Sequence, residues 1–259
     1  AFLNVGFEVY DITMNDIIKS NGKLIHKFNG LAFVGGFSFS DVLGSSVGWS
    51  ASIIFNDDIK QEFKRFYNDE SKFSLGVCNG CQLMSLIGFI PEVRLVENKS
   101  TRFESRCVSI KIYKNSNSIF LKDMEDIVFN MWSAHGEGRF LIEDEDLIQN
   151  IKCNGSNFNN ENNNKNYINK NICPIRYADD YGNATEKYPF NPNGSVGGVA
   201  GISSLNGRHF ALMPHPERCI LKWQLPYVPG EYREKLNIYS PWIYIFKNAY
   251  NFCKDDNHI

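Results

Sequence analysis

Short apolar runs alternate with amphipathic stretches along the chain. Residues 31–34 and 73–77 are continuous apolar or small runs, which are typical of strands buried on both faces of a sheet. Residues 59–67, and the stretch that follows Cys78, instead place apolar side chains at helical spacing. This alternation of strand and helix signals predicts an α/β fold, with a central, mostly parallel sheet flanked by helices.

Extended segments recur in the second half of the chain, at residues 108–113, 127–132, 198–203 and 209–213. Residues 241–250 predict a C-terminal helix with Pro241 in its first turn. Residues 1–7 resemble the tail of a helix ended by Gly6, and residues 7–11 resemble a strand. Because a domain seldom begins within a helix, we expect the first strand of this domain to be missing from the chain.

One segment has a composition unlike the rest. Eleven of the 22 residues from Asn150 to Asn171 are asparagine. Such a segment cannot build a hydrophobic core, so residues 150–171 are predicted to form a disordered insertion at the surface. We find no internal repeat and no linker elsewhere, and therefore expect residues 1–259 to form one domain.

Charge and composition mainly exclude classes of function and location. The 27 basic and 29 acidic side chains give a net charge of −2, which provides no basic surface for nucleic acid or for an anionic membrane. No apolar run reaches the roughly 18 residues of a membrane span, and the N-terminus lacks the pattern of a signal peptide. Seven scattered cysteines, an odd number, favour the reducing cytoplasm over a disulfide framework.

The sequence Gly-Val-Cys-Asn-Gly at residues 76–80 lies where the strand of residues 73–77 meets the next helix. This spacing is that of a nucleophile elbow, with cysteine in the nucleophile position. The turn is strained and closely packed, which explains a glycine on either side. The dipole of the following helix stabilises a thiolate at Cys78, and the backbone N–H of Asn79 points to a developing oxyanion.

Other roles for Cys78 remain open from these residues alone. With Cys81 it could form a redox pair or half of a zinc site, although no second Cys-x-x-Cys and no histidine pair with ligand spacing accompanies it. It could also be a buried structural cysteine. The flanking glycines favour the nucleophile, and we expect no metal site.

A cysteine nucleophile needs a base, and His215 has the most informative context among the five histidines. It stands between two prolines, which hold its backbone in a fixed turn, and Glu217 follows two residues later. Glu217 can then orient one imidazole nitrogen while the other faces the sulfur, as in a nucleophile–base–acid triad. A His-x-Glu pair alone is more often found on a surface, but beside a cysteine elbow it favours the triad.

The third element is a glycine pair, Gly35 and Gly36, which follows the strand of residues 31–34. Such a pair at the end of a strand can present a backbone N–H to an oxyanion, and it is equally compatible with an ordinary tight turn. Taken with the elbow, the expected oxyanion hole consists of Gly36, Phe37 and Asn79.

These motifs, in this order, resemble those of a class I glutamine amidotransferase. Members of that family carry an early Gly-Gly loop, a Gly-x-Cys-x-Gly-x-Gln elbow and a late histidine–glutamate motif, and Gln82 completes the elbow here. The similarity narrows to a branch that serves purine biosynthesis, and it extends over nearly the whole chain outside the Asn-rich stretch. The stretches that carry it are residues 35–44, 76–82, 135–139, 188–195, 213–218 and 240–242.

The resemblance implies a flavodoxin-like fold and hydrolysis of L-glutamine to glutamate and ammonia through a thioester on Cys78. It also implies that Gln82 and His135 contact the substrate. The ammonia would pass to a synthetase, in the same long chain or in a separate subunit, which converts formylglycinamide ribonucleotide to formylglycinamidine ribonucleotide. ATP and Mg²⁺ would belong to that partner, because this chain has no Gly-x-x-x-x-Gly-Lys-Ser/Thr phosphate loop.

Two other interpretations share part of this pattern. A free-standing cysteine hydrolase of similar fold would carry the elbow, but need not retain Gln82 or the loop around His135. A non-catalytic docking domain would be expected to have lost a member of the triad, whereas all three residues are present.

Overall fold

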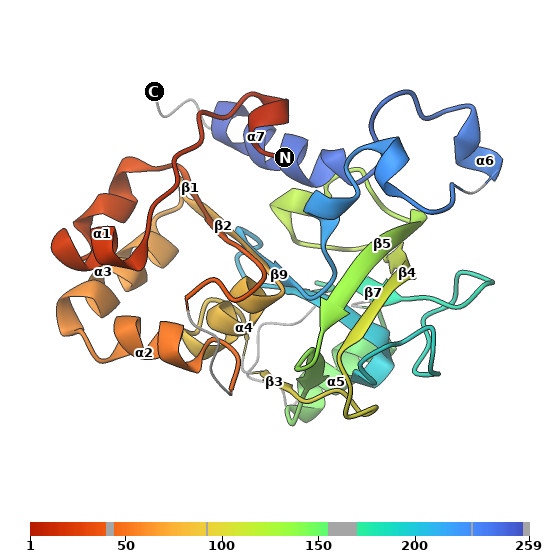
Figure 1. Cartoon of the computed structure of the whole chain (residues 1–259), viewed down its shortest axis with the longest axis horizontal. Coiled ribbons are helices and arrows are strands. Elements are labelled where there is room, and N and C mark those ends of the chain that lie inside the picture. The colour runs from red at the N-terminus through yellow and green to blue at the C-terminus, as the bar shows by residue number, and fades with distance from the viewer. Residues whose placement is uncertain (40–43, 92, 155–169, 229, 256–259) are drawn as a thin grey trace.

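The chain forms a curled seven-stranded sheet flanked by helices (Figure 1). The computed structural model describes residues 1–39, 44–91, 93–154, 170–228 and 230–255. The sheet contains, in spatial order, β1 (Gly30–Phe33), β2 (Phe73–Val77), β9 (His209–Leu212), β8 (Val199–Ser203), β7 (Ile175–Tyr177), β4 (Glu104–Ile112) and β5 (Val128–His135). A separate antiparallel pair is formed by β3 (Arg94–Val96) and β6 (Arg139–Leu141).

The helices gather mainly around the β1 end and the upper edge of the sheet (Figure 1). The α-helices are α1 (Met14–Lys19), α2 (Val47–Ile54), α3 (Asp57–Asn68), α4 (Asn79–Leu86), α5 (Glu145–Lys152), α6 (Gly230–Arg233) and α7 (Ile243–Asp255). Short 3₁₀ helices are η1 (Leu3–Val5), η2 (Lys23–Lys27), η3 (Ile119–Leu121), η4 (Val196–Gly198), η5 (Pro216–Arg218) and η6 (Lys222–Gln224). In the described part of the chain, no helix is long and apolar enough to cross a membrane.

Helix α3 shows how the local sequence produces these elements. The side chain of Asn56 accepts a hydrogen bond from the N–H of Ile59 at 3.2 Å, which caps the helix, and two aspartates occupy its first turn. Ile59, Phe63 and Phe66 are buried on one face, as the helical spacing of residues 59–67 predicted. The helix therefore anchors the β1 side of the sheet.

The predicted α/β class, a central sheet flanked by helices, is confirmed, but the prediction of a mostly parallel sheet is wrong. Only the β1–β2 and β2–β9 pairings are parallel; β9–β8, β8–β7, β7–β4 and β4–β5 are antiparallel. Buried and partly exposed residues alternate along β5 and over most of β4, as in strands with one face outside the core. A flavodoxin-like, parallel arrangement is thus limited to three strands.

The predicted strand at residues 7–11 is also absent. These residues follow the short helix η1, which ends at Gly6 with φ +108°, and they pair with no strand. Val9 and Tyr10 are 51% and 58% exposed, so the apolar side chains that motivated the strand do not enter the core. Sequence periodicity over five residues did not distinguish this extended coil from a strand.

The two ends of the Asn-rich segment of residues 150–171 are part of the folded structure. Residues 155–169 lie outside the described part of the chain, so the predicted disorder is not addressed there. At the two ends, however, Asn150 and Asn171 are fully buried. Asn150 belongs to α5 and donates from Nδ2 to the carbonyl of Lys170 at 2.8 Å, and Asn171 donates from Nδ2 to the carbonyl of Lys114 at 3.1 Å. Both ends therefore belong to the folded domain.

A buried histidine in β9 makes the stability of the fold sensitive to pH. His209 is fully buried, with Nδ1 bonded to Ser74 Oγ at 2.8 Å and Nε2 to the carbonyl of Tyr67 at 3.1 Å. Burial lowers its pKa to about 4. The neutral ring therefore stabilises the fold above the unfolded pKa of ~6.5, and that contribution is lost as the pH falls toward 4.

We expect protonation of His209 to lower the free energy of unfolding by about 2 kcal/mol when the pH is lowered from 7 to 5. Urea denaturation at several pH values would measure this, with His209→Asn as the comparison. The variant should be less stable at pH 7 but should show a shallower dependence on pH. An unchanged pH dependence would mean that the buried imidazole does not control acid stability.

Candidate active site

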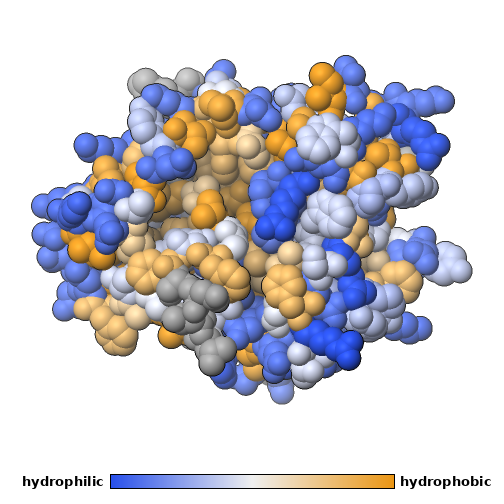
Figure 2. All heavy atoms as spheres, viewed as in Figure 1, coloured by the Kyte–Doolittle hydropathy of each residue, from blue (hydrophilic) through white to orange (hydrophobic). Residues whose placement is uncertain are grey.

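The predicted site residues converge at the carboxyl ends of the three parallel strands. Gly35 and Gly36 follow β1, Cys78 follows β2, and His215 lies three residues beyond β9. These strands are neighbours in the sheet, so segments distant in sequence meet at one edge. In open α/β sheets, the crevice at the carboxyl ends of the strands is the usual ligand site. Figure 2 shows the surface hollowed in the middle of the same view.

Cys78 occupies the strained turn that its glycine neighbours predicted. Its backbone has φ +52° and ψ −103°, a conformation that residues with a side chain rarely adopt. The turn is held because the N–H of Cys78 donates to the carbonyl of Leu212 at 2.8 Å, and its carbonyl accepts from the N–H of Gln82 at 3.1 Å. The thiol is thereby held at the start of α4, with 8% of the residue exposed.

Close packing explains both glycines of the elbow. A methyl group on Gly80 would lie 1.9 Å from the carbonyl oxygen of Phe33. One on Gly76 would lie 2.5 Å from Sδ of Met84 and 2.7 Å from the carbonyl oxygen of Gly80. These are distances that no side chain can accept, so α4 packs directly onto β1 and β2 only because both positions lack Cβ.

His215 is almost fully buried, at 1% exposure; its Nδ1 has a carboxylate partner, whereas its Nε2 has no hydrogen-bond partner among the described residues. Nδ1 lies 2.6 Å from Oε1 of Glu217, and the backbone N–H donates to the carbonyl of Trp132 at 2.7 Å. Burial by itself would lower the pKa of His215, but the nearby Cys78 thiol and the hydrogen-bonded carboxylate of Glu217 outweigh it and raise the pKa to about 9. The environment therefore favours an imidazolium at neutral pH.

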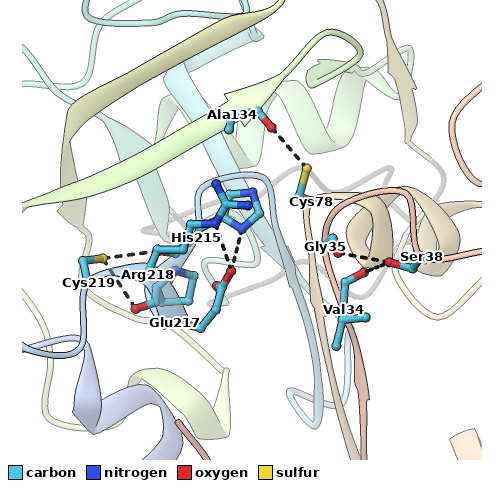
Figure 3. A network of polar contacts seen from close by, with 10 residues as sticks. Val34, Gly35, Ser38, Cys78, Ala134, His215, Glu217, Arg218 and Cys219 are labelled. Atoms are coloured by element: carbon cyan, nitrogen blue, oxygen red, sulfur yellow. Dashed lines mark hydrogen bonds and ion pairs between the residues drawn. The ribbon is translucent and has the colours of Figure 1, made fainter. Parts of the chain in front are cut away.

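Gly35 lies against both His215 and Cys78. A methyl group at this position would lie 2.7 Å from Cε1 of His215 and 3.3 Å from Cβ of Cys78. Figure 3 shows the His215 ring with Glu217 on one side and Cys78 on the other. The sulfur also lies 3.6 Å from the carbonyl oxygen of Ala134, at the end of β5. The structure thus brings Cys78, His215 and Glu217 together.

The glycine loop after β1 is open where an oxyanion hole was predicted. Gly36 has φ +88° and no atom near the position of a Cβ, and Phe37 is 70% exposed. Ser38 Oγ donates to the carbonyls of Val34 at 2.8 Å and Gly35 at 3.1 Å, which fixes the turn (Figure 3). Asn79, the third predicted member, is the first residue of α4, where helical N–H groups lack intrahelical partners.

Gln82 and His135, predicted to contact substrate, have buried structural partners. Gln82 accepts from Asn79 Nδ2 at 3.1 Å and donates from Nε2 to the carbonyl of Glu137 at 2.7 Å. His135 is 2% exposed, with Nε2 2.7 Å from Ser133 Oγ, and burial followed by the charge of His215 lowers its pKa to about 4. The Gln82 side chain therefore holds the loop that follows β5, and the His135 side chain is bonded within β5 itself. Their contact with substrate stays a prediction.

No group of three or more His, Cys, Asp or Glu side chains in the described ranges could hold a metal ion. All seven cysteines are free thiols, including Cys78 and Cys81. The chemistry available at this edge of the sheet is therefore that of a thiol beside a carboxylate-bound imidazole, with unpaired backbone N–H groups close by.

Comparison with known families matches the sequence of this chain to a described domain. The model of the CobB/CobQ-like glutamine amidotransferase domain matches residues 1–158 and 153–253. The chain belongs to this family. As a member of the glutamine amidotransferases, it carries the elbow, the histidine–glutamate pair and the glycine loop in the order that its sequence predicted.

Among curated proteins, several long relatives of this amidotransferase are similar throughout its length. Phosphoribosylformylglycinamidine synthase of Dictyostelium discoideum is 45% identical over 99% of the chain, and that of Homo sapiens is 41% identical over 97%. The chain spans only 18% and 19% of these relatives. Among solved structures, PurLQS from Thermotoga maritima has a TM-score of 0.55 at 22% identity, covering 88% of this chain and 79% of that one, which supports the fold.

Sequence reasoning missed two features of this amidotransferase site. The first is Gly35: the sequence favoured Gly36 for the oxyanion loop, whereas Gly35 is the residue whose missing side chain leaves room for His215. The second is the carbonyl of Ala134, which contacts the sulfur from a strand 56 residues away. Adjacent glycines signalled the first position, but no residue type marks a backbone carbonyl.

Proposed function

We propose that the chain hydrolyses L-glutamine to glutamate and ammonia, with Cys78 as nucleophile, His215 as base and Glu217 as the group that orients it. One observation carries the proposal. A cysteine on a strained elbow stands beside a buried histidine whose Nδ1 is bound by a carboxylate at 2.6 Å. A structural cysteine would need neither the strain nor the paired histidine.

The reaction follows from the groups present. The Cys78 thiolate attacks the carboxamide carbon of glutamine, and the charge on the oxygen is stabilised by the backbone N–H groups of Asn79 and of the Gly36–Phe37 turn. His215 gives a proton to the departing ammonia, which leaves a γ-glutamyl thioester on the sulfur. Water activated by His215 then hydrolyses the thioester and restores the thiol.

The wall of the proposed glutamine site is the backbone that follows β5. Ala134 contacts the sulfur, and the loop of residues 135–138 continues from it. Gln82 bonds this loop from a buried position and His135 is its buried first residue, so we assign both side chains to its support and assign substrate contact to the loop backbone itself. No cofactor takes part in this scheme, because each step uses only side chains and backbone groups of the chain.

The long relatives are named for the synthesis of phosphoribosylformylglycinamidine, and their chains extend far beyond the matched region. We therefore propose that the ammonia is delivered to a synthetase, in the same long chain or a separate subunit. That partner would bind ATP and Mg²⁺ and convert formylglycinamide ribonucleotide to formylglycinamidine ribonucleotide. The seven free thiols are consistent with work in the cytoplasm.

Dependence on this partner provides the test. We expect the isolated chain to hydrolyse glutamine slowly, because hydrolysis without an acceptor wastes ammonia. Adding the synthetase portion with ATP and formylglycinamide ribonucleotide should raise glutamate release at least ten-fold, a coupling of ~1.4 kcal/mol or more. Equal rates in the two assays would favour a free-standing hydrolase, and no release in either would favour a non-catalytic docking domain.

A further inference from the structure

The loop after β5 is held through an unbroken series of backbone carbonyls. All four carbonyl oxygens of residues 135–138 accept hydrogen bonds from amide groups of residues 82, 98 and 193. In order along the loop, the donors are Asn98 Nδ2 at 2.8 Å, the Asn98 backbone N–H at 2.9 Å, Gln82 Nε2 at 2.7 Å and Asn193 Nδ2 at 2.7 Å. These three residues come from three separate segments of the chain.

Asn98 bridges the two ends of the loop. It is 2% exposed and lies just beyond β3, where its Nδ2 also donates to the carbonyl of Arg102 at 2.9 Å. Its Oδ1 accepts from the N–H of Gly138 at 3.1 Å. One side chain therefore bonds the first and the last residue of the loop, and both of its polar atoms are used.

Asn193 secures the far end from beneath. It is fully buried, and its Nδ2 bonds both the carbonyl of Gly138 and Oη of Tyr177, the latter at 3.1 Å. Its Oδ1 accepts from the N–H and Oγ of Ser195, at 3.0 and 2.7 Å. The amide is thus tied on both sides, and it cannot turn without breaking bonds in the core.

This arrangement decides which backbone groups of the loop remain available. In a trans peptide the carbonyl and the following N–H point in opposite directions. Because the carbonyls of His135 and Gly136 are turned toward buried amides, the N–H groups of Gly136 and Glu137 are turned away from them. Two consecutive N–H groups of this kind suit a carboxylate, such as the α-carboxylate of an amino acid.

The loop also touches the other parts of the site. It continues from Ala134, whose carbonyl lies 3.6 Å from the sulfur of Cys78. Glu137 Oε2 accepts from the N–H of Ser45, close to the start of α2, at 2.8 Å. Two glycines in four residues would leave this loop many conformations if its carbonyls were unbonded.

We propose that Asn98 and Asn193 are positioning residues for glutamine, which hold the 135–138 loop in the conformation that receives the substrate. The inference rests on the proposed glutaminase function. It states that the affinity for glutamine depends on two buried side-chain amides that do not touch the reacting atoms. Loss of either amide frees a loop carbonyl, and the peptide can then rotate and withdraw an N–H from the substrate. Recognition should weaken while the chemistry at Cys78 is unchanged.

The test compares two ways of alkylating Cys78. A diazoketone analogue of glutamine must be recognised before it reacts, whereas iodoacetamide needs only the thiolate. For Asn98→Ala and Asn193→Ala, we expect the inhibition constant of the analogue to rise at least ten-fold. The maximal inactivation rate, and the iodoacetamide rate followed by mass spectrometry of the Cys78 peptide, should stay within three-fold of the parent chain.

Asn191→Ala is the matched control. Asn191 is 1% exposed and its Nδ2 also donates to two backbone carbonyls, those of Thr185 at 3.2 Å and Ser195 at 2.9 Å, neither of which belongs to the loop. It should lose comparable stability and keep the parent inhibition constant. If the alanine variant at position 98, 191 or 193 does not unfold cooperatively on heating, the serine variant at that position is used in its place.

The outcomes separate the two proposals. An inhibition constant within three-fold of the parent at positions 98 and 193, or an equal rise in the Asn191 variant, would overturn the positioning role and leave the glutaminase assignment intact. Failure of the analogue to label Cys78 in the parent chain would instead remove the proposed function itself.

Discussion

Replacing Cys78 by serine or alanine is expected to lower glutamate release by ~10³-fold or more, since triad nucleophiles contribute at this level. The loss is large because the attacking atom disappears, while the elbow that holds it remains. Glutamate release should be measured with the synthetase portion, ATP and formylglycinamide ribonucleotide present, so that a low basal rate does not mask the effect. Thermal unfolding should show that the variants remain folded.

Labelling supplies the complementary measurement. A glutamine-analogue alkylator should modify Cys78 alone among the seven cysteines, because Cys81, Cys173 and Cys219 are fully buried, and burial raises the pKa of each. Cys153 is exposed and serves as an internal control, since it should react with iodoacetamide but not with the analogue. Modification of Cys81 in place of Cys78 would refute the nucleophile assignment.

Replacing His215 by asparagine should lower glutamate release by about 10²–10⁴-fold, the usual contribution of a positioned acid–base group. Glu217→Gln should cost less, about ten-fold, because its side chain is 36% exposed and water screens part of its charge. The same change removes the anion beside Nδ1, so the pKa of His215 should fall from about 9 toward its ordinary value.

Nuclear magnetic resonance titration of the His215 ring would detect that fall directly. The sign of the linkage to stability is the reverse of that for His209. A raised pKa stabilises the folded protein below pH 6.5, and the contribution is lost as the pH rises through 9. A parent chain whose His215 titrates at an unshifted pKa, with an unchanged value in Glu217→Gln, would contradict the paired arrangement.

The sequence predicted the elbow because its signal is local. Strand β2, the turn at Cys78 and helix α4 are consecutive, and two glycines mark the places where backbones touch. The histidine–glutamate pair is equally compact. The capping box of Thr13 and Asp16 that begins α1 is a local signal of the same kind.

The sheet was predicted less well because strand direction is decided by partners far away in sequence. Buried and partly exposed residues alternate along β5 in the structure, as is typical of antiparallel strands, whereas the continuous buried run of β2 is typical of parallel ones. The contacts of Asn98 and Asn193 with the 135–138 loop could not be predicted from the sequence for the same reason. An asparagine that bonds a loop residue 40 or 55 positions away has no local signature, and asparagine is common in turns for other reasons.

The parallel and the antiparallel parts of the curled sheet carry different parts of the proposed site. The proposed nucleophile, the proposed base and the glycine loop all follow the parallel strands β1, β2 and β9, whereas the wall of the proposed glutamine pocket follows the antiparallel strand β5. If both proposals hold, reactivity and affinity are set by different strands of one sheet. Substitutions on the β5 side would then change how tightly glutamine is held without disturbing the geometry of bond cleavage.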